Sequence, residues 1–128
     1  MNLCFPDLPY IPNNTDYFII LPNGSEIWVG GLDDKARAEK ILGQEYSTMF
    51  FNECSQLPYS SISLGLTRLA EKNKLKNKAY FDENPPSKRH WSYWRFVKLI
   101  DPETENDLDP KKYASLIINP HQNQNRYR

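Results

Sequence analysis

A short apolar run at residues 46–53 constrains the fold of this chain more than any other segment. Its centre, residues 48–51, reads Thr-Met-Phe-Phe, and the run ends abruptly in Asn52 and Glu53. Four β-favouring residues bounded by polar ones predict a short buried strand. Many α/β enzymes place a catalytic base at the end of such a strand. The same pattern also occurs where an ordinary strand ends in an acidic turn.

The length and charge of the chain limit the classes of protein that it can represent. A chain of 128 residues holds one domain, or part of one. Charged residues make up 25% and balance to a formal net charge of zero, so any contact with DNA would have to be local. The aromatic content of 13% predicts a folded chain, and the ten prolines predict many loops.

Neither the cysteines nor the apolar runs indicate a metal site, a disulfide framework or a membrane span. Cys4 and Cys54 have no spacing typical of a zinc site, and Cys54 is expected to be a small buried residue. The first residues lead quickly into Pro6 and Asp7, which predicts no signal peptide. No run approaches the ~20 apolar residues of a membrane helix, so an intracellular setting is expected.

The first third of the chain predicts a loop and then a β-hairpin. Residues 1–16 are rich in proline, asparagine and aspartate, which is loop chemistry. The β-favouring segments 17–21 and 26–29 flank Asn23-Gly24, a strong signal for a tight hairpin turn.

Three helices, two more strands and two irregular segments are expected in addition to the hairpin and the strand at 48–51. The helices are expected from Asp33 or Asp34 to about Leu42, from Pro58 to about Asn73, and from Ser87 through Val97. The strands are expected at residues 78–81 and 113–118. Residues 101–110 form an acidic loop and residues 121–128 a flexible tail in this interpretation. Trp91 and Trp94 are expected in the core rather than on a nucleic-acid platform, and His90 is expected at the surface or at an interface.

The spacing of the central strands predicts a shared edge. A helix joins the strands at 48–51 and 78–81, which favours a parallel, right-handed connection. Asn52 and Glu53 follow the first strand, and Asn84 follows the second. Because the carboxyl ends of parallel strands meet at the edge where ligands bind, these three residues are expected to lie near one another.

Four segments, in this order, resemble the large terminase subunit of tailed bacteriophages, the ATPase that drives DNA into the capsid. The segments are Gly31-Leu32-Asp33-Asp34 with Lys40-Ile41-Leu42-Gly43, then Met49-Phe50-Phe51-Asn52-Glu53, then Asn84-Pro85-Pro86-Ser87 with His90-Trp91 and Arg95-Phe96, and last Leu116-Ile117-Ile118-Asn119-Pro120 with Asn123. The first segment looks like the stretch ahead of the family's Walker B strand, and the second like that strand with its catalytic glutamate. The third looks like the coupling motif with the helix after it, and the fourth like the strand and loop that close the ATPase core. The resemblance implies an α/β fold, a partial P-loop-NTPase-like (ASCE) parallel sheet with an N-terminal β-hairpin and flanking helices. Residues 1–128 would form one partial domain, the later half of a terminase ATPase domain.

The resemblance also implies roles for three residues. Glu53 matches the general base that activates the water attacking the γ-phosphate. Asn52 stands where many ATPases carry an aspartate that holds Mg²⁺ through water, so its part in metal binding would be weak and indirect. Asn84 matches the coupling residue that senses the γ-phosphate. A structural alternative stays open for each residue. Glu53 can be a glutamate that precedes the helix at Pro58, Asn52 an asparagine that ends a strand, and Asn84 a turn asparagine before proline.

The phosphate-binding loop that ATP hydrolysis needs does not occur in this sequence. No Gly-x-x-x-x-Gly-Lys-Ser/Thr is present, and neither is a cluster of nuclease-type aspartates. ATP and Mg²⁺ are the cofactors of the complete family protein, and we expect this chain alone to bind neither tightly and to show negligible ATPase activity. The simplest interpretation is a fragment, from a split or decayed prophage gene or from an interrupted subunit.

The implied partners are double-stranded DNA, the portal, the small terminase subunit and a missing N-terminal ATPase segment, in the cytoplasm of the bacterial host. An alternative is a free-standing phage or prophage interaction protein, or a relic, that binds a protein partner without catalysis. An unrelated α/β domain would instead leave Glu53 and Asn84 far apart. The candidates for phosphate contact or for a trans-acting arginine are Lys35, Arg37, Arg68, Lys88, Arg89 and Arg95.

Overall fold

The computed structural model describes residues 5–32 and 35–119, which belong to two compact units. The first unit draws on residues 1–49 and 63–79, and the second on residues 50–62 and 80–128. Within the described residues, no helix is both long enough and apolar enough to cross a membrane.

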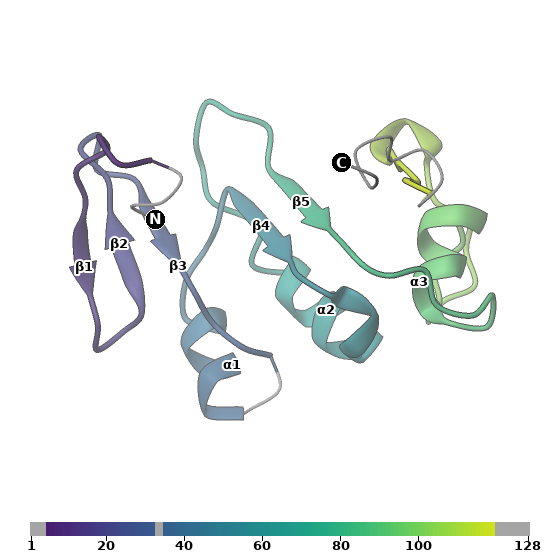
Figure 1. Ribbon diagram of the computed structural model, residues 1–128. Coiled ribbons are helices and arrows are strands. Elements are labelled where there is room, and N and C mark those ends of the chain that lie inside the picture. The colour runs from purple at the N-terminus through teal and green to yellow at the C-terminus, as the bar shows by residue number, and fades with distance from the viewer. Residues whose placement is uncertain (1–4, 33–34, 120–128) are drawn as a thin grey trace, which may run out of the picture. The chain divides into compact units, whose positions relative to one another are not determined.

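An antiparallel sheet of three strands opens the first unit (Figure 1). Its strands are β1 (Ile11–Asn13), β2 (Phe18–Ile20) and β3 (Glu26–Trp28). The turn between β2 and β3 contains Gly24 with φ of +80°, a conformation that glycine adopts without steric cost. Phe18 and Trp28 face each other in the register and stack at 4.4 Å between ring centroids. The predicted hairpin is therefore confirmed.

Strand β1 was not predicted, because residues 1–16 were expected to form a loop, and this expectation was wrong for residues 11–13. Pro12 pairs with Ile19 of β2, although a proline cannot donate a hydrogen bond to a ladder. The position is tolerated because β1 lies at the edge of the sheet, where one side of the strand needs no partner.

Helix α1 (Lys35–Leu42) follows, as the sequence predicted. Gly43 donates its N–H to the Glu39 carbonyl at 3.0 Å and ends the helix. The predicted caps, Asp33 and Asp34, lie outside the described residues.

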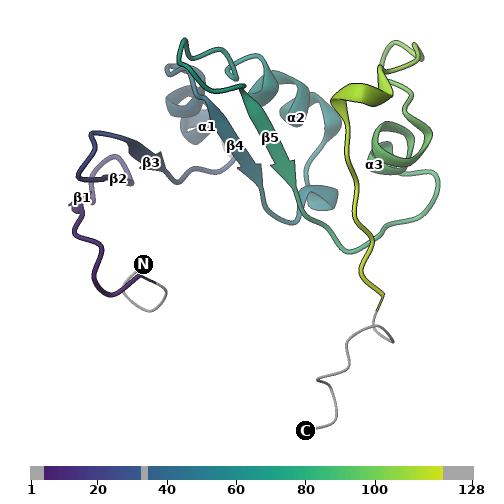
Figure 2. The same ribbon diagram turned by 90° about the horizontal axis from the view of Figure 1, so that it is seen from above.

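Two strands pair in parallel, with the bounds that the sequence predicted. They are β4 (Thr48–Phe51) and β5 (Lys78–Phe81). Lys78 donates its N–H to the Ser47 carbonyl and Asp82 to the Phe51 carbonyl, each at 3.1 Å. The sequence offset is the same at both ends, as in a parallel pair, and Figure 2 shows the two strands side by side and pointing the same way. The predicted α/β class with a parallel sheet and an N-terminal hairpin is confirmed.

Helix α2 (Tyr59–Leu66) begins after Pro58, as predicted, but it ends well before Asn73. Gly65 stands in its last turn, where glycine weakens a helix. The following residues make tighter turns, in which Thr67 and Arg68 each donate to the carbonyl three residues earlier.

The aromatic helix also starts later than predicted. Helix α3 (Trp91–Tyr93) runs into a π-helical turn, Trp94–Lys98. Its cap is His90, whose Nδ1 accepts the Ser92 N–H at 3.3 Å, and not Ser87. Residues 87–90 instead form a turn, which the His90 N–H closes by donating to the Ser87 carbonyl at 2.9 Å.

The last predicted strand, residues 113–118, does not form. This segment follows a 3₁₀ turn (Pro110–Lys112), and no described strand pairs with it. Leu116, Ile117 and Ile118 are 84%, 63% and 75% exposed. Their β-propensity is not enough without a neighbouring strand to accept and donate hydrogen bonds. The predicted flexible tail at 121–128 lies outside the described residues.

A small aromatic core holds the second unit together. Phe81 stacks on Phe51 at 4.9 Å and contacts Phe96 at 4.8 Å between ring centroids. Trp91 packs against Phe96, as expected, but Trp94 is 43% exposed, so its predicted place in the core is wrong. The buried apolar residues of the described chain are Phe51, Cys54 and Ile62.

Candidate functional site

The carboxyl ends of β4 and β5 meet in the second unit and carry the residues that the sequence singled out. Asn52 and Glu53 follow β4 directly, and Asp82, Glu83 and Asn84 follow β5. Asn52 and Asn84 are exposed, and Glu53 is half-buried.

Glu53 occupies an unusual backbone conformation. Its φ of 49° and ψ of 45° place it in the left-handed region, where a side chain with a β-carbon costs roughly 1 kcal/mol. The Glu53 N–H donates to Oδ1 of Asp82 at 2.7 Å, and the N–H of Cys54 donates to the Asp82 carbonyl at 2.9 Å. Asp82 therefore holds the turn with both its side chain and its main chain.

Glu83 makes a further contact across the two strand ends. The Cys54 thiol, which is fully buried, lies 3.5 Å from Oε2 of Glu83. Burial, then the Glu83 carboxylate and more weakly that of Asp82, raises the pKa of Cys54 to about 12. The thiol is thus protonated at neutral pH, and Cys54 is a small buried residue, as predicted, and no nucleophile.

The structure brings together the two chain segments that carry the predicted site residues. Residues 53–54 are hydrogen-bonded to residues 82–83, and Asn84 is the next residue along the chain. This adjacency does not fit an unrelated domain in which the two segments would lie far apart. The roles of Asn52, Glu53 and Asn84 themselves stay predictions. No group of three or more metal-ligating side chains occurs in the described part of the chain.

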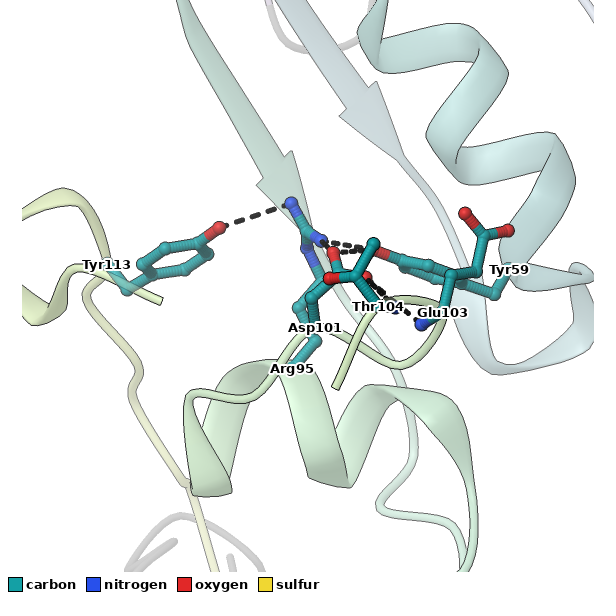
Figure 3. A network of polar contacts seen from close by, with 6 residues as sticks. All are labelled: Tyr59, Arg95, Asp101, Glu103, Thr104 and Tyr113. Atoms are coloured by element: carbon teal, nitrogen blue, oxygen red, sulfur yellow. Dashed lines mark hydrogen bonds and ion pairs between the residues drawn. The ribbon is translucent and has the colours of Figure 1, made fainter. Parts of the chain in front are cut away.

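A second polar cluster surrounds Arg95 (Figure 3). Arg95 Nη1 lies 3.2 Å from Oδ2 of Asp101 and also donates to the Tyr59 hydroxyl. Its Nη2 donates to the Tyr113 hydroxyl at 3.1 Å. The guanidinium lies over both tyrosine rings, 5.5 and 5.6 Å from their centroids, and the side chain is 13% exposed.

The Arg95 cluster contains an ion pair between Arg95 and Asp101, and neutral N–H and O–H groups donate to the Asp101 carboxylate. Burial alone would raise the pKa of Asp101, but hydrogen bonds from the Thr104 N–H, the Tyr59 hydroxyl and the Glu103 N–H lower it to about 2. Burial and the bond to Asp101 raise the pKa of Tyr59 above its usual value. At neutral pH the carboxylate is therefore ionised and the phenol is protonated.

Sequence reasoning missed this cluster, and it had treated Arg95 as a candidate for phosphate contact. The guanidinium is already engaged by Asp101 and two tyrosines, which favours a structural role. The turn of Asp101 over Glu103 and Thr104 was a usable signal, because aspartate commonly caps the N–H groups two and three residues later. Among the other candidates, Lys88 and Arg89 are exposed and Arg68 is half-buried. The side chains of Lys35 and Arg37 lie outside the described part.

Comparisons with known proteins cover most of this chain. A family model described as phage terminase large subunit matches residues 11–127. The solved structure of the large terminase from a thermophilic bacteriophage is similar, with a TM-score of 0.63 and 20% sequence identity. The likeness covers 83% of this chain and 26% of that terminase, so this chain spans about a quarter of that protein's length. At this identity it shows the fold alone. No curated protein matches the sequence.

Proposed function

The chain belongs to the phage terminase large subunit family, and on this premise we propose that it forms part of the ATPase that packages double-stranded DNA into a procapsid. The observation that carries the proposal is the hydrogen-bonded junction between the ends of β4 and β5. It joins the segment with Glu53 to the segment with Asn84, which are the Walker B and coupling segments in this proposal.

In this proposal Glu53 is the general base. Its carboxylate accepts a hydrogen bond from the water that attacks the γ-phosphate, and so orients and activates that water. Asn84 can donate to a phosphate oxygen and accept from water, which suits a residue that distinguishes ATP from ADP. Mg²⁺, when bound, neutralises charge on the phosphates, and the exposed Asn52 amide would reach it through water.

The phosphate-binding loop must be supplied from outside these 128 residues, because the sequence contains no Walker A motif. Positioning and electrostatics provide nearly all of the catalysis in phosphoryl transfer, so Glu53 needs a bound phosphate to act on. The chain alone is therefore proposed to have negligible ATPase activity. The proposed partners are double-stranded DNA, the portal, the small terminase subunit and an N-terminal ATPase segment, and the proposed location is the host cytoplasm.

The test begins with the DNA on either side of the reading frame. If a Walker A segment is encoded upstream, that segment is co-expressed with this chain, and Mg²⁺-dependent ATP hydrolysis is measured with and without double-stranded DNA. The proposal expects turnover from the pair, little from this chain alone, and loss of turnover with Glu53→Gln. Glu45→Gln is the matched control, since Glu45 is exposed and precedes β4. Full turnover in Glu53→Gln contradicts the proposal.

The exposed apolar segment favours a second candidate function. Leu116, Ile117 and Ile118 are mostly exposed, and contiguous apolar surface of this kind is common at protein–protein contacts. The alternative is a free-standing phage or prophage protein, or a relic, that binds a protein partner without catalysis. Unrelated DNA on both sides of the reading frame favours this alternative over the ATPase.

A further inference from the structure

We propose that Asp82 is a positioning residue that sets the backbone conformation of Glu53 and links it to the segment carrying Asn84. The proposal rests on the proposed function where it treats Glu53 as the base. The contacts of Asp82 themselves are independent of that role.

Asp82 makes three hydrogen bonds to the end of β4 and the turn after it. Its N–H donates to the Phe51 carbonyl at 3.1 Å, its carbonyl accepts the Cys54 N–H at 2.9 Å, and its Oδ1 accepts the Glu53 N–H at 2.7 Å. The first two are main-chain bonds that any residue except proline could make at this position. The third needs a side-chain acceptor of this length, so it is specific to the residue type at position 82.

The third bond is also the one that bears on Glu53. A carboxylate accepts an N–H more strongly than a neutral acceptor does. At 2.7 Å it offsets part of the cost of the left-handed conformation of Glu53, with its φ of 49°. Without it, the residue is free to return toward the commoner extended or right-handed conformations, and its side chain then leaves from a different direction.

The position of Asp82 in the chain connects the turn at Glu53 to the segment that carries Asn84. Asp82 is the first residue after β5, and Asn84 follows two residues later. Between them, Glu83 contacts the Cys54 thiol at 3.5 Å. If the Asn84 segment moves on loss of the γ-phosphate, as the proposed function expects, the movement would reach the turn that carries Glu53 through the contacts of Asp82 and Glu83.

The link is tested first in the 128-residue chain, by amide hydrogen exchange followed by NMR. Asp82→Ala is expected to speed the exchange of the Glu53 amide about tenfold or more, and Asp82→Asn, which keeps a neutral acceptor, is expected to have a smaller effect. Asp109→Ala is the matched control, because Asp109 Oδ1 accepts the Lys111 N–H at 3.0 Å in the same unit. It should speed exchange at Lys111 and leave Glu53 unchanged. A Glu53 amide that exchanges equally in wild type and Asp82→Ala overturns the proposal.

The consequence for catalysis is tested in the ATPase completed by its Walker A segment. Asp82→Ala is expected to lower kcat about tenfold to a hundredfold with little change in KM for ATP, because a misplaced base slows the chemical step and not binding. Asp82→Asn should recover part of the loss. If Glu53→Gln abolishes turnover and Asp82→Ala leaves kcat unchanged, the positioning role is wrong. If Glu53→Gln itself retains turnover, the proposed function fails, and the exchange experiment still decides whether Asp82 holds the turn.

Discussion

The Tyr59 hydroxyl donates a 2.7 Å hydrogen bond to Oδ2 of Asp101, a residue 42 positions further along the chain. The same oxygen lies 3.2 Å from Arg95 Nη1, so one carboxylate oxygen receives a neutral and a charged donor. Arg95 also bonds Tyr113, which fastens the residues before the exposed C-terminal segment to the rest of the second unit. The cluster thereby joins four separate parts of this unit through one partly buried guanidinium.

Removing that guanidinium should destabilise the second unit. Arg95→Ala leaves Asp101 without its ion-pair partner, and loss of this partly buried, hydrogen-bonded pair is expected to cost on the order of 2 kcal/mol. The midpoint of urea unfolding, followed by tryptophan fluorescence, is expected to fall clearly below that of Arg89→Ala, which removes an exposed arginine. Arg95→Lys should lie between the two, because lysine keeps the charge and loses the forked geometry. Equal midpoints for Arg95→Ala and Arg89→Ala would show that the cluster adds nothing.

Acid should remove a stabilisation that belongs to Asp101. Its pKa is about 2 in the folded chain, against 3.8 for an ordinary aspartate, so folding favours the ionised form. The stabilisation is fully present above about pH 4 and is lost as the pH falls through about 2. Between pH 5 and pH 2.5 the free energy of unfolding is expected to drop by on the order of 1 kcal/mol more in wild type than in Asp101→Asn. Identical pH dependence in the two proteins would rule out this assignment.

The Cys54 thiol should resist alkylation in the folded chain. With a pKa of about 12 instead of 9.0, its thiolate fraction at pH 8 is about a thousandfold lower, and burial also blocks access. The rate of reaction with iodoacetamide is measured in a Cys4→Ser background, with and without urea. Glu83→Gln should speed the folded-state reaction, because the Glu83 carboxylate helps to raise this pKa. A folded-state rate equal to that in urea contradicts the burial of Cys54.

Polar substitutions in the exposed apolar segment should change association and leave folding stability alone. Leu116→Ser with Ile118→Ser removes side chains that are 84% and 75% exposed. The double variant is expected to self-associate less by light scattering, with an unfolding midpoint close to that of wild type. Ile62→Ser is the contrasting control, since Ile62 is fully buried and its loss should lower the midpoint strongly. A large drop in the midpoint of the double variant would mean that the segment packs in solution.

Local signals in the sequence were sufficient for the elements that depend on local chemistry. The strands at 48–51 and 78–81 are β-favouring runs bounded by polar residues, and their bounds agree with β4 and β5. The hairpin followed from Asn23-Gly24. Strand β1 was missed because its pairing with β2 decides its structure, and Pro12 argues locally against it. The segment 113–118 was wrongly assigned for the reverse reason, since its residues favour a strand but have no described partner.

In the candidate site, too, the sequence predicted the local features and missed those that depend on tertiary contacts. The position of Glu53 at the end of β4 followed from the sequence, because a polar residue ends the apolar run there. Its left-handed backbone and its bond to Asp82 did not, since they depend on how two strands align across 29 residues. In the Arg95 cluster only the local turn at Asp101 had a sequence signal, because Tyr59 and Tyr113 reach Arg95 only through the tertiary fold.

The most direct test of the central claim is a single-turnover measurement on the ATPase completed by its Walker A segment. Binding of ATP and the rate of the hydrolysis step are measured separately for wild type, Glu53→Gln and the control Glu45→Gln. If Glu53 is the general base, Glu53→Gln binds ATP with unchanged affinity and hydrolyses it about a hundredfold to ten-thousandfold more slowly, while Glu45→Gln behaves as wild type. A hydrolysis rate in Glu53→Gln equal to that of the wild type would contradict the account.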